Sequence, residues 1–159
     1  MKTMASCTAH LNALALLFLL APLVYGQNDK HFALLPKSQT TAISQLCSRS
    51  GPKIEGSWKP TKDDIEVLES SLSLISKLKS EGDKSDVHIK TPSSYYRQYL
   101  GVLVDGRRLI YLNAFAPSLL RSDWRDRLVD ICDGGTGAWG VLYDPEKREF
   151  SRLTANGGF

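Results

Sequence analysis

The apolar residues between positions 62 and 79 recur at intervals of three and four, which is the period of an amphipathic helix. These positions are Ile65, Leu68, Leu72, Ile75 and Leu78. Thr61 precedes the pattern, and Asp64 lies three residues after Thr61. This is the spacing of a capping box at a helix N-terminus. Gly82 comes after the last apolar position and favours the end of a helix. The pattern predicts one long helix over residues 62–79.

Two runs rich in aromatic and β-branched residues, 95–104 and 107–115, predict a pair of strands. Asp105 and Gly106 separate the runs, and this dipeptide tolerates the positive φ angles of a tight hairpin turn. Pairing outward from the turn predicts three neighbouring pairs on one face, namely Val102 with Leu109, Leu100 with Tyr111, and Tyr96 with Phe115.

Three shorter runs after the hairpin, residues 128–132, 138–143 and 149–154, also have the composition of strands. A helix followed by consecutive strands predicts a single α+β domain, with one long helix packed on a four- to five-stranded antiparallel meander. Residues 27–57 instead combine polar residues and two prolines with short apolar patches. We therefore expect an irregular N-terminal arm at 27–57, followed by the α+β domain at 58–159.

The first 26 residues have the three-part pattern of a secretory signal peptide. Lys2 gives a positively charged start, residues 13–24 are apolar, and Gly26 supplies a small residue before the polar Gln27. The apolar segment has about a dozen residues, whereas a membrane-spanning helix needs roughly 20. We therefore expect cleavage after Gly26, leaving a secreted or periplasmic protein that is not held in a membrane.

Removal of residues 1–26 leaves two cysteines, Cys47 and Cys132, in an exported chain. An even number of cysteines in an oxidising compartment predicts a disulfide. The alternatives are two free thiols or a metal site. A metal site is disfavoured because the cysteines lack CxxC spacing and only two histidines, His31 and His88, accompany them.

The charge of the mature chain is almost balanced, with 19 Lys and Arg residues against 17 Asp and Glu residues. Nucleic-acid binding requires clustered positive charge that follows the phosphates. The strongest basic cluster lies at 121–127, but Asp123 and Asp126 interrupt it. We therefore expect no nucleic-acid partner.

The chain has no residue pattern that predicts catalysis or a cofactor. The glycine-rich segment 133–137 leads into a predicted strand, whereas a phosphate-binding loop leads into a helix. A serine or cysteine nucleophile needs a base within hydrogen-bonding reach, and His31 and His88 lie in the arm and before the first predicted strand. The adjacent carboxylates Asp63 and Asp64 are explained by helix capping. These observations predict a protein that is not an enzyme and has no cofactor.

Four segments between residues 95 and 157 carry a resemblance to known proteins. They are Leu109-Ile110-Tyr111-Leu112-Asn113-Ala114-Phe115, Cys132-Asp133-Gly134-Gly135, Trp139-Gly140-Val141-Leu142-Tyr143-Asp144, and Phe150-Ser151-Arg152-Leu153-Thr154-Ala155-Asn156-Gly157. The chain resembles an uncharacterised family of small exported bacterial proteins, a resemblance that implies the fold of this half but no mechanism. The predicted layout of a helix on a meander is also similar to cystatin-like domains in topology, although residues 101–108 lack the cystatin signature Gln-x-Val-x-Gly.

Small size, export, a disulfide and the lack of a catalytic pattern together predict a non-catalytic binding protein. Its expected form is an inhibitor or immunity-type partner of an exported hydrolase. The alternatives are a small secreted hydrolase with an unrecognised carboxylate site, or a structural envelope component. Exposed turns on rigid strands suit such contacts, and the expected contact residues are Asp105, Gly106, Arg107 and Arg108 in one turn and Gly134, Gly135 and Trp139 in the other, with Trp139 as the anchor.

Overall fold

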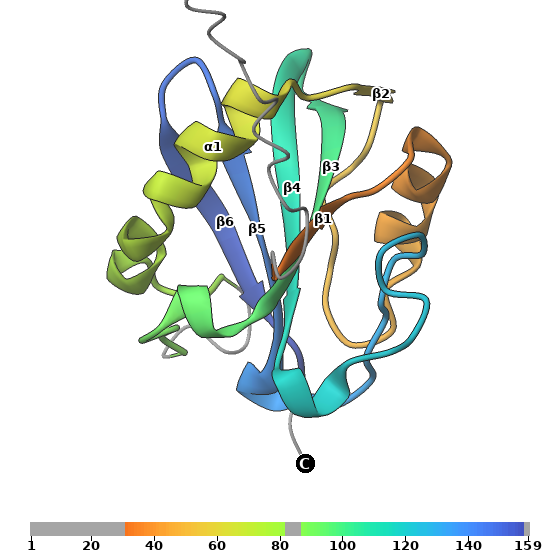
Figure 1. Ribbon diagram of the computed structural model, residues 1–159, viewed down its shortest axis with the longest axis vertical. Helices are drawn as coiled ribbons and strands as arrows, with labels where there is room; N and C mark the ends of the chain where they lie inside the picture. Colours follow the sequence, from red (N-terminus) through yellow and green to blue (C-terminus); the bar gives the residue numbers. More distant parts are fainter. Residues whose placement is uncertain (1–30, 82–86, 158–159) are drawn as a thin grey trace, which may run out of the picture.

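The computed structural model describes residues 31–81 and 87–157, and the predicted signal peptide (residues 1–26) lies outside them. A six-stranded sheet forms the centre of the molecule (Figure 1). Its strands are β1 (Phe32–Leu34), β2 (Gly56–Trp58), β3 (Tyr96–Val104), β4 (Arg107–Phe115), β5 (Ala138–Asp144) and β6 (Glu149–Ala155). Among the described residues, no helix has the length and apolar character needed to cross a membrane.

The β3–β4 hairpin has the predicted strands and the predicted register. Val102 pairs with Leu109, Leu100 with Tyr111, and Tyr96 with Phe115. Asp105 and Gly106 have φ angles of 51° and 71°, as a two-residue turn with left-handed residues requires. β5 pairs with β4 and β6 pairs with β5, so the strands predicted at 138–143 and 149–154 are also confirmed.

The sheet is mixed, so the prediction of a four- to five-stranded antiparallel meander is wrong, although the α+β class holds. β1 runs parallel to β3 and pairs with residues 97–99, whereas β2 is antiparallel and pairs with residues 101–103 on the same edge. The segment predicted to be an irregular arm thus contributes strands to the sheet, and it also contains the 3-10 helix η1 (Lys37–Gln45). Strands of three residues are too short to show an alternating pattern in the sequence.

An α-helix occupies only the first half of the segment predicted to form one long helix. α1 (Lys62–Ser70) begins at the predicted capping box, but the 3-10 helix η2 (Leu72–Lys77) takes the place of its continuation. The hydroxyls of Ser70 and Ser71 both donate to the backbone carbonyl of Val67. Such bonds compete with the regular helical pattern and bend helices, and the amphipathic period does not report them.

The two faces of the sheet carry separate apolar cores. The first face packs under α1 and η2 and is built from Ile65, Leu68, Leu72, Ile75, Tyr99, Ile110, Leu112, Ala114, Trp139, Val141, Tyr143 and Leu153, among others. The second face packs under η1 and the loops that follow it, through Leu35, Ile43, Leu100, Val102, Val104, Leu109, Tyr111 and Leu142. Figure 1 shows α1 on one side of the sheet and η1 on the other.

Residues 128–132 do not form the predicted third strand and belong to a loop that is bonded to side chains of the sheet. The N–H of Val129 donates to Oε1 of Gln98 at 2.9 Å, and its carbonyl accepts from Nδ2 of Asn113 at 2.9 Å. The N–H of Leu128 donates to Oε1 of Gln39 at 3.0 Å. Side-chain amides therefore take the place of a strand partner, and the composition of residues 128–132 alone contains no sign of them.

An ion pair between Glu69 of α1 and Arg97 of β3 fixes the helix to the first face. Nε and Nη2 of Arg97 each donate to a Glu69 oxygen at 3.0 Å, and the hydroxyl of Tyr99 donates to the same carboxylate. Burial, reinforced by the charge of Glu69, raises the pKa of Tyr99 well above its usual value. Burial alone lowers the pKa of Arg97, but its hydrogen bonds and attraction to Glu69 outweigh this effect and raise it.

We expect the free energy of unfolding to fall as the pH rises above about 10, because Tyr99 then keeps its proton only in the folded chain. Because the pKa of Tyr99 is higher in the folded chain, its contribution to stability is complete below its pKa in the unfolded chain. The contribution is lost as the pH rises to the pKa of Tyr99 in the folded chain. Urea unfolding between about pH 7 and pH 11 measures the decline.

The variant Tyr99→Phe lacks this ionisation, so its stability should decline less steeply above pH 10. The stability of the variant should still decline to some extent, because burial also raises the pKa values of Tyr95 and Tyr143. At neutral pH the variant also loses a hydrogen bond to a carboxylate, which costs about 1.5–3 kcal/mol. Equal slopes for the variant and the natural chain contradict the prediction.

Candidate functional site

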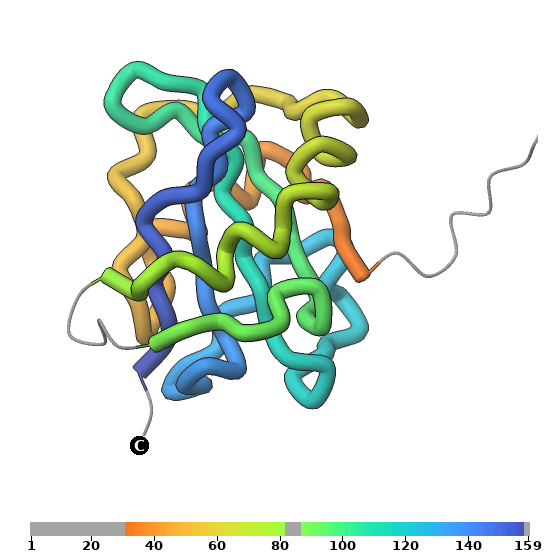
Figure 2. Tube along the Cα trace, turned by 90° about the vertical axis from the view of Figure 1, so that its left-hand side faces the viewer, coloured from red at the N-terminus to blue at the C-terminus, as the bar shows by residue number. Residues whose placement is uncertain are grey.

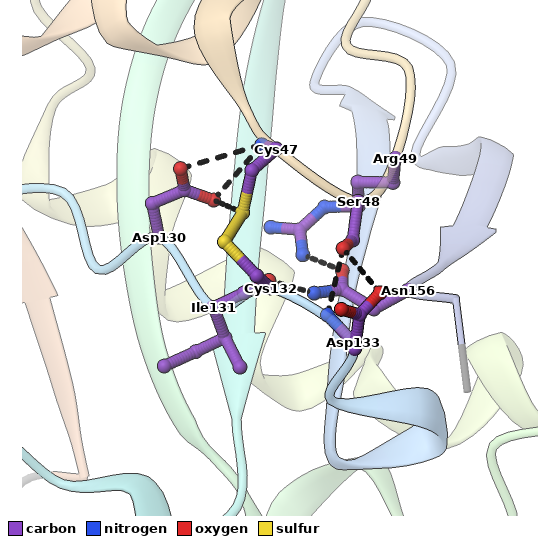
Figure 3. Close-up of a disulfide and its surroundings, with 8 residues drawn as sticks. All are labelled: Cys47, Ser48, Arg49, Asp130, Ile131, Cys132, Asp133 and Asn156. Atoms are coloured by element: carbon purple, nitrogen blue, oxygen red, sulfur yellow. Dashed lines mark hydrogen bonds between the residues drawn. A yellow bond between two sulfur atoms is a disulfide. The ribbon is translucent and has the colours of Figure 1, made fainter. Parts of the chain in front are cut away.

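Cys47 and Cys132 form the predicted disulfide, with their Cα atoms 5.4 Å apart (Figure 3). The bridge joins the loop after η1 to the loop at residues 128–132. Next to it, the hydroxyl of Ser48 donates to the Asp133 carboxylate at 3.2 Å and accepts from the Asp133 N–H at 2.7 Å. The N–H of Cys47 also donates to the carboxylate of Asp130 at 3.3 Å. These bonds hold the two loops together on both sides of the bridge.

Arg49, two residues after the bridged Cys47, is turned inward and is only 9% exposed. Its Nε donates to the hydroxyl of Tyr111 at 3.2 Å, Nη1 donates to Oδ1 of Asn156, and Nη2 donates to Oδ1 of Asn113. Figure 3 shows its guanidinium group extending from the loop to Asn156. All three acceptors are neutral, and Arg49 is in none of the ion pairs formed between described residues.

The acceptors of Arg49 belong to a buried network that continues across the sheet. Nδ2 of Asn113 donates to Gln98 at 2.8 Å, and Nε2 of Gln98 donates to the carbonyl of Arg127 at 2.7 Å. Nδ2 of Asn156 donates to the carbonyl of Ile131. Every one of these amides thus has partners, as buried polar groups require.

The network was not predicted from the sequence, although one sign of it is present there. Gln98 and Asn113 lie opposite each other in the hairpin. In the predicted register they fall on the same face as Leu100 and Tyr111, which is a face expected to be apolar. A polar pair at such positions indicates a buried hydrogen-bonded group. Arg49 itself, in a segment predicted to be irregular, has no comparable sign.

A cavity of about 710 Å³ opens beside Arg49 on the second face of the sheet. It is lined by Ser48, Arg49, Ser50, Gly51, Pro52, Glu81, Tyr111, Leu142, Arg152, Thr154, Ala155 and Gly157. We call it the Arg49 pocket. The ring of Tyr111 lies so close to Gly140 that any side chain there would meet its hydroxyl, so this glycine allows Tyr111 to reach Arg49. In the part of the chain that the structure describes, no cluster of three or more His, Cys, Asp or Glu side chains is placed to hold a metal ion.

Arg152 lies at the rim of the pocket in an unusual backbone conformation. It is a non-glycine residue with a φ of 53°, at a register shift between β5 and β6. This β-bulge directs Arg152 to the pocket lining, and its guanidinium also pairs with Asp105 at 3.3 Å. A strained residue at the edge of a cavity is a common property of functional sites.

The predicted contact turn at residues 105–108 is exposed and lies at one end of the sheet. Four contacts hold it. The N–H of Gly106 donates to Glu55 at 2.9 Å, and Asp105 pairs with Arg152 at 3.3 Å. The other two contacts are an ion pair between Arg107 and Asp144 at 3.3 Å and the placement of Arg108 over the Trp58 ring at 5.6 Å. Figure 2 shows this turn and the β5–β6 turn at the same end of the sheet.

The second predicted contact turn is at the opposite end, and its expected anchor is not on the surface. Gly134 and Gly135 precede β5 and are only partly exposed, while Trp139 is fully buried in the first-face core with Tyr95 edge-on at 5.4 Å. The prediction of Trp139 as an exposed anchor is therefore wrong, because its position in β5 directs it into the first-face core and not into the turn. The two turns are also separated by the length of β4, about 27 Å, so they lie at opposite ends of the sheet.

Comparisons with known proteins found no relative from which a function could be inferred. A scan against protein-family models found no match, and neither did searches of curated proteins and of solved structures. The resemblance to small exported bacterial proteins and to a cystatin-like layout therefore stays a prediction. The function has to be inferred from the contacts of the described residues.

We expect Trp139→Ala to lower the free energy of unfolding by about 3–5 kcal/mol, because it leaves a large cavity in the core. Chemical denaturation followed by circular dichroism measures the change. A variant with an unchanged unfolding midpoint would place the tryptophan outside the core and contradict the structure.

We expect removal of the disulfide to destabilise the fold by about 4–5 kcal/mol, because the bridge closes a long loop in the unfolded chain. The double variant Cys47→Ser and Cys132→Ser tests this by denaturant unfolding. Intact mass of the exported protein should increase by two hydrogens on reduction. Alkylation of both cysteines without a reductant contradicts the bridge.

Proposed function

We propose that this chain is a non-catalytic binding protein that acts outside the cytoplasm, in the periplasm or as a secreted protein, and recognises another protein through the β3–β4 turn. The disulfide supports this location, because such bridges persist in oxidising compartments. The predicted signal peptide leads to the same compartment.

The observation that carries the proposal is an exposed turn whose residues are all held by contacts outside the turn. Asp105, Gly106, Arg107 and Arg108 are all exposed, yet each one is held by a contact with a different residue outside the turn. A loop that is already ordered loses little conformational entropy when it binds, so more of its contact energy appears as affinity. Binding loops on a rigid sheet are a common arrangement in recognition proteins.

The specific form of the proposal is an inhibitor or immunity-type partner of a secreted hydrolase. A hairpin turn at the end of a sheet is narrow enough to enter a cleft. Two adjacent arginines, Arg107 and Arg108, complement a cleft that is lined with carboxylates, such as the paired acids of glycoside hydrolases. Charge complementarity of this kind increases both the rate and the specificity of association.

We expect the double variant Arg107→Gln and Arg108→Gln to bind the partner at least tenfold more weakly, or about 1.4 kcal/mol, with its melting temperature nearly unchanged. The melting temperature should hold because the ion pair of Arg107 with Asp144 is partly exposed, and such pairs contribute only about 0–1 kcal/mol. Immobilised protein is used to capture partners from the culture medium and periplasm of the source cells. Mass spectrometry identifies them, and interferometry measures their affinity.

The matched control is the double variant Arg121→Gln and Arg127→Gln, which removes two exposed arginines far from the turn. It should retain the partner in a one-to-one complex, and an inhibitor should also suppress the activity of a captured enzyme. Equal binding by the two double variants would exclude the turn as the contact surface. Hydrolytic activity of the isolated chain that survives the turn substitutions would favour the alternative of a small hydrolase.

A further inference from the structure

Two arginines are buried in the described part of the chain, and only one of them has a counter-charge. Arg97 is 5% exposed, and two of its nitrogens bond to the carboxylate of Glu69. Arg49 is 9% exposed, and its acceptors are the neutral oxygens of Tyr111, Asn113 and Asn156. A buried charge without an opposite charge is strongly unfavourable. The guanidinium of Arg97 faces the carboxylate of Glu69, whereas the guanidinium of Arg49 lines an open pocket.

We propose that the Arg49 pocket binds a small organic anion through a carboxylate or phosphate group placed against Arg49. The site is distinct from the β3–β4 turn and does not depend on the protein partner proposed above.

The guanidinium group keeps unused donors for such a ligand. A guanidinium has five N–H donors. The bonds to Tyr111, Asn156 and Asn113 use one donor on each of the three nitrogens of Arg49. One N–H therefore remains on each terminal nitrogen. Carboxylate and phosphate oxygens are the acceptors that bind most strongly to these donors.

The remaining lining sets the size and charge of the ligand. A volume of about 710 Å³ lies in the range of small-molecule sites and exceeds the size of a bare ion. Arg152 adds a second positive charge at the rim, and Thr154 adds a hydroxyl. Glu81 in the same lining repels a second anionic group, so a ligand with one charged end is favoured over a polyanion.

The test uses the exported, disulfide-bonded protein labelled with ¹⁵N and titrated separately with sodium acetate and sodium phosphate at constant ionic strength. We expect saturable shifts of the amide signals of residues 48–51 and 152–157. Saturation by acetate alone indicates a carboxylate ligand, and saturation by phosphate indicates a phosphorylated ligand or free phosphate. Both outcomes support the proposal.

Three variants make the test decisive. Arg49→Gln should weaken anion binding at least about tenfold, because it removes the charge and the paired donors. Ser50→Trp places a bulky ring in the pocket from an exposed position of the lining and should abolish binding without touching the bonds of Arg49. Arg121→Gln, on a distant surface, should bind as the natural chain does.

The proposal is overturned if neither anion gives saturable shifts in residues 48–51 and 152–157, or if Ser50→Trp binds as tightly as the natural chain. Unchanged affinity in a folded Arg49→Gln variant overturns it as well. Should Arg49→Gln not fold, the mapped shifts and the Ser50→Trp variant still decide the question.

Discussion

The amide group of Asn113 connects the sheet with two of the loops that cover its second face. Its Nδ2 donates to Gln98 at 2.8 Å and to the carbonyl of Val129 at 2.9 Å, while its Oδ1 accepts from Arg49. A buried amide is stable only when its polar atoms have partners. The loop that contains Val129 and the loop that contains Arg49 must therefore reach Asn113 together. The disulfide between Cys47 and Cys132 joins the same two loops and keeps them in reach.

Both faces of the sheet carry an apolar core, but the polar contacts that accompany the two cores differ. On the first face, α1 and η2 pack through apolar side chains, and the pair of Glu69 with Arg97 supplies the main polar link. On the second face, directional hydrogen bonds fix the loops, so that small displacements break several bonds at once. A polar network of this kind specifies side-chain positions closely. The Arg49 pocket lies on the second face, beside this network.

The elements that could be predicted from the sequence depend on neighbours in the chain. The hairpin register follows from the Asp105–Gly106 turn, the start of α1 from its capping box, and the disulfide from the cysteine count. The elements that could not be predicted depend on distant partners. Residues 128–132 are held by side-chain amides of η1, β3 and β4, and Arg49 bonds to Asn113 and Asn156, which are 64 and 107 positions away. Trp139 was misplaced for a similar reason, because the glycines beside it suggest exposure while the strand position decides its burial.

The backbone strain at Arg152 can be compared with the energy of the ion pair that its side chain makes. A left-handed conformation costs a residue with a side chain about 1–2 kcal/mol, and glycine adopts it freely. The pair of Arg152 with Asp105 is about half exposed on both sides, with side-chain exposures of 47% and 62%, and a pair of this kind returns only about 0–1 kcal/mol. The ion pair alone therefore does not offset the strain of the bulge. The second surface that the Arg152 side chain reaches is the Arg49 pocket, where a further positive charge benefits an anionic ligand and leaves the packing of the fold unchanged.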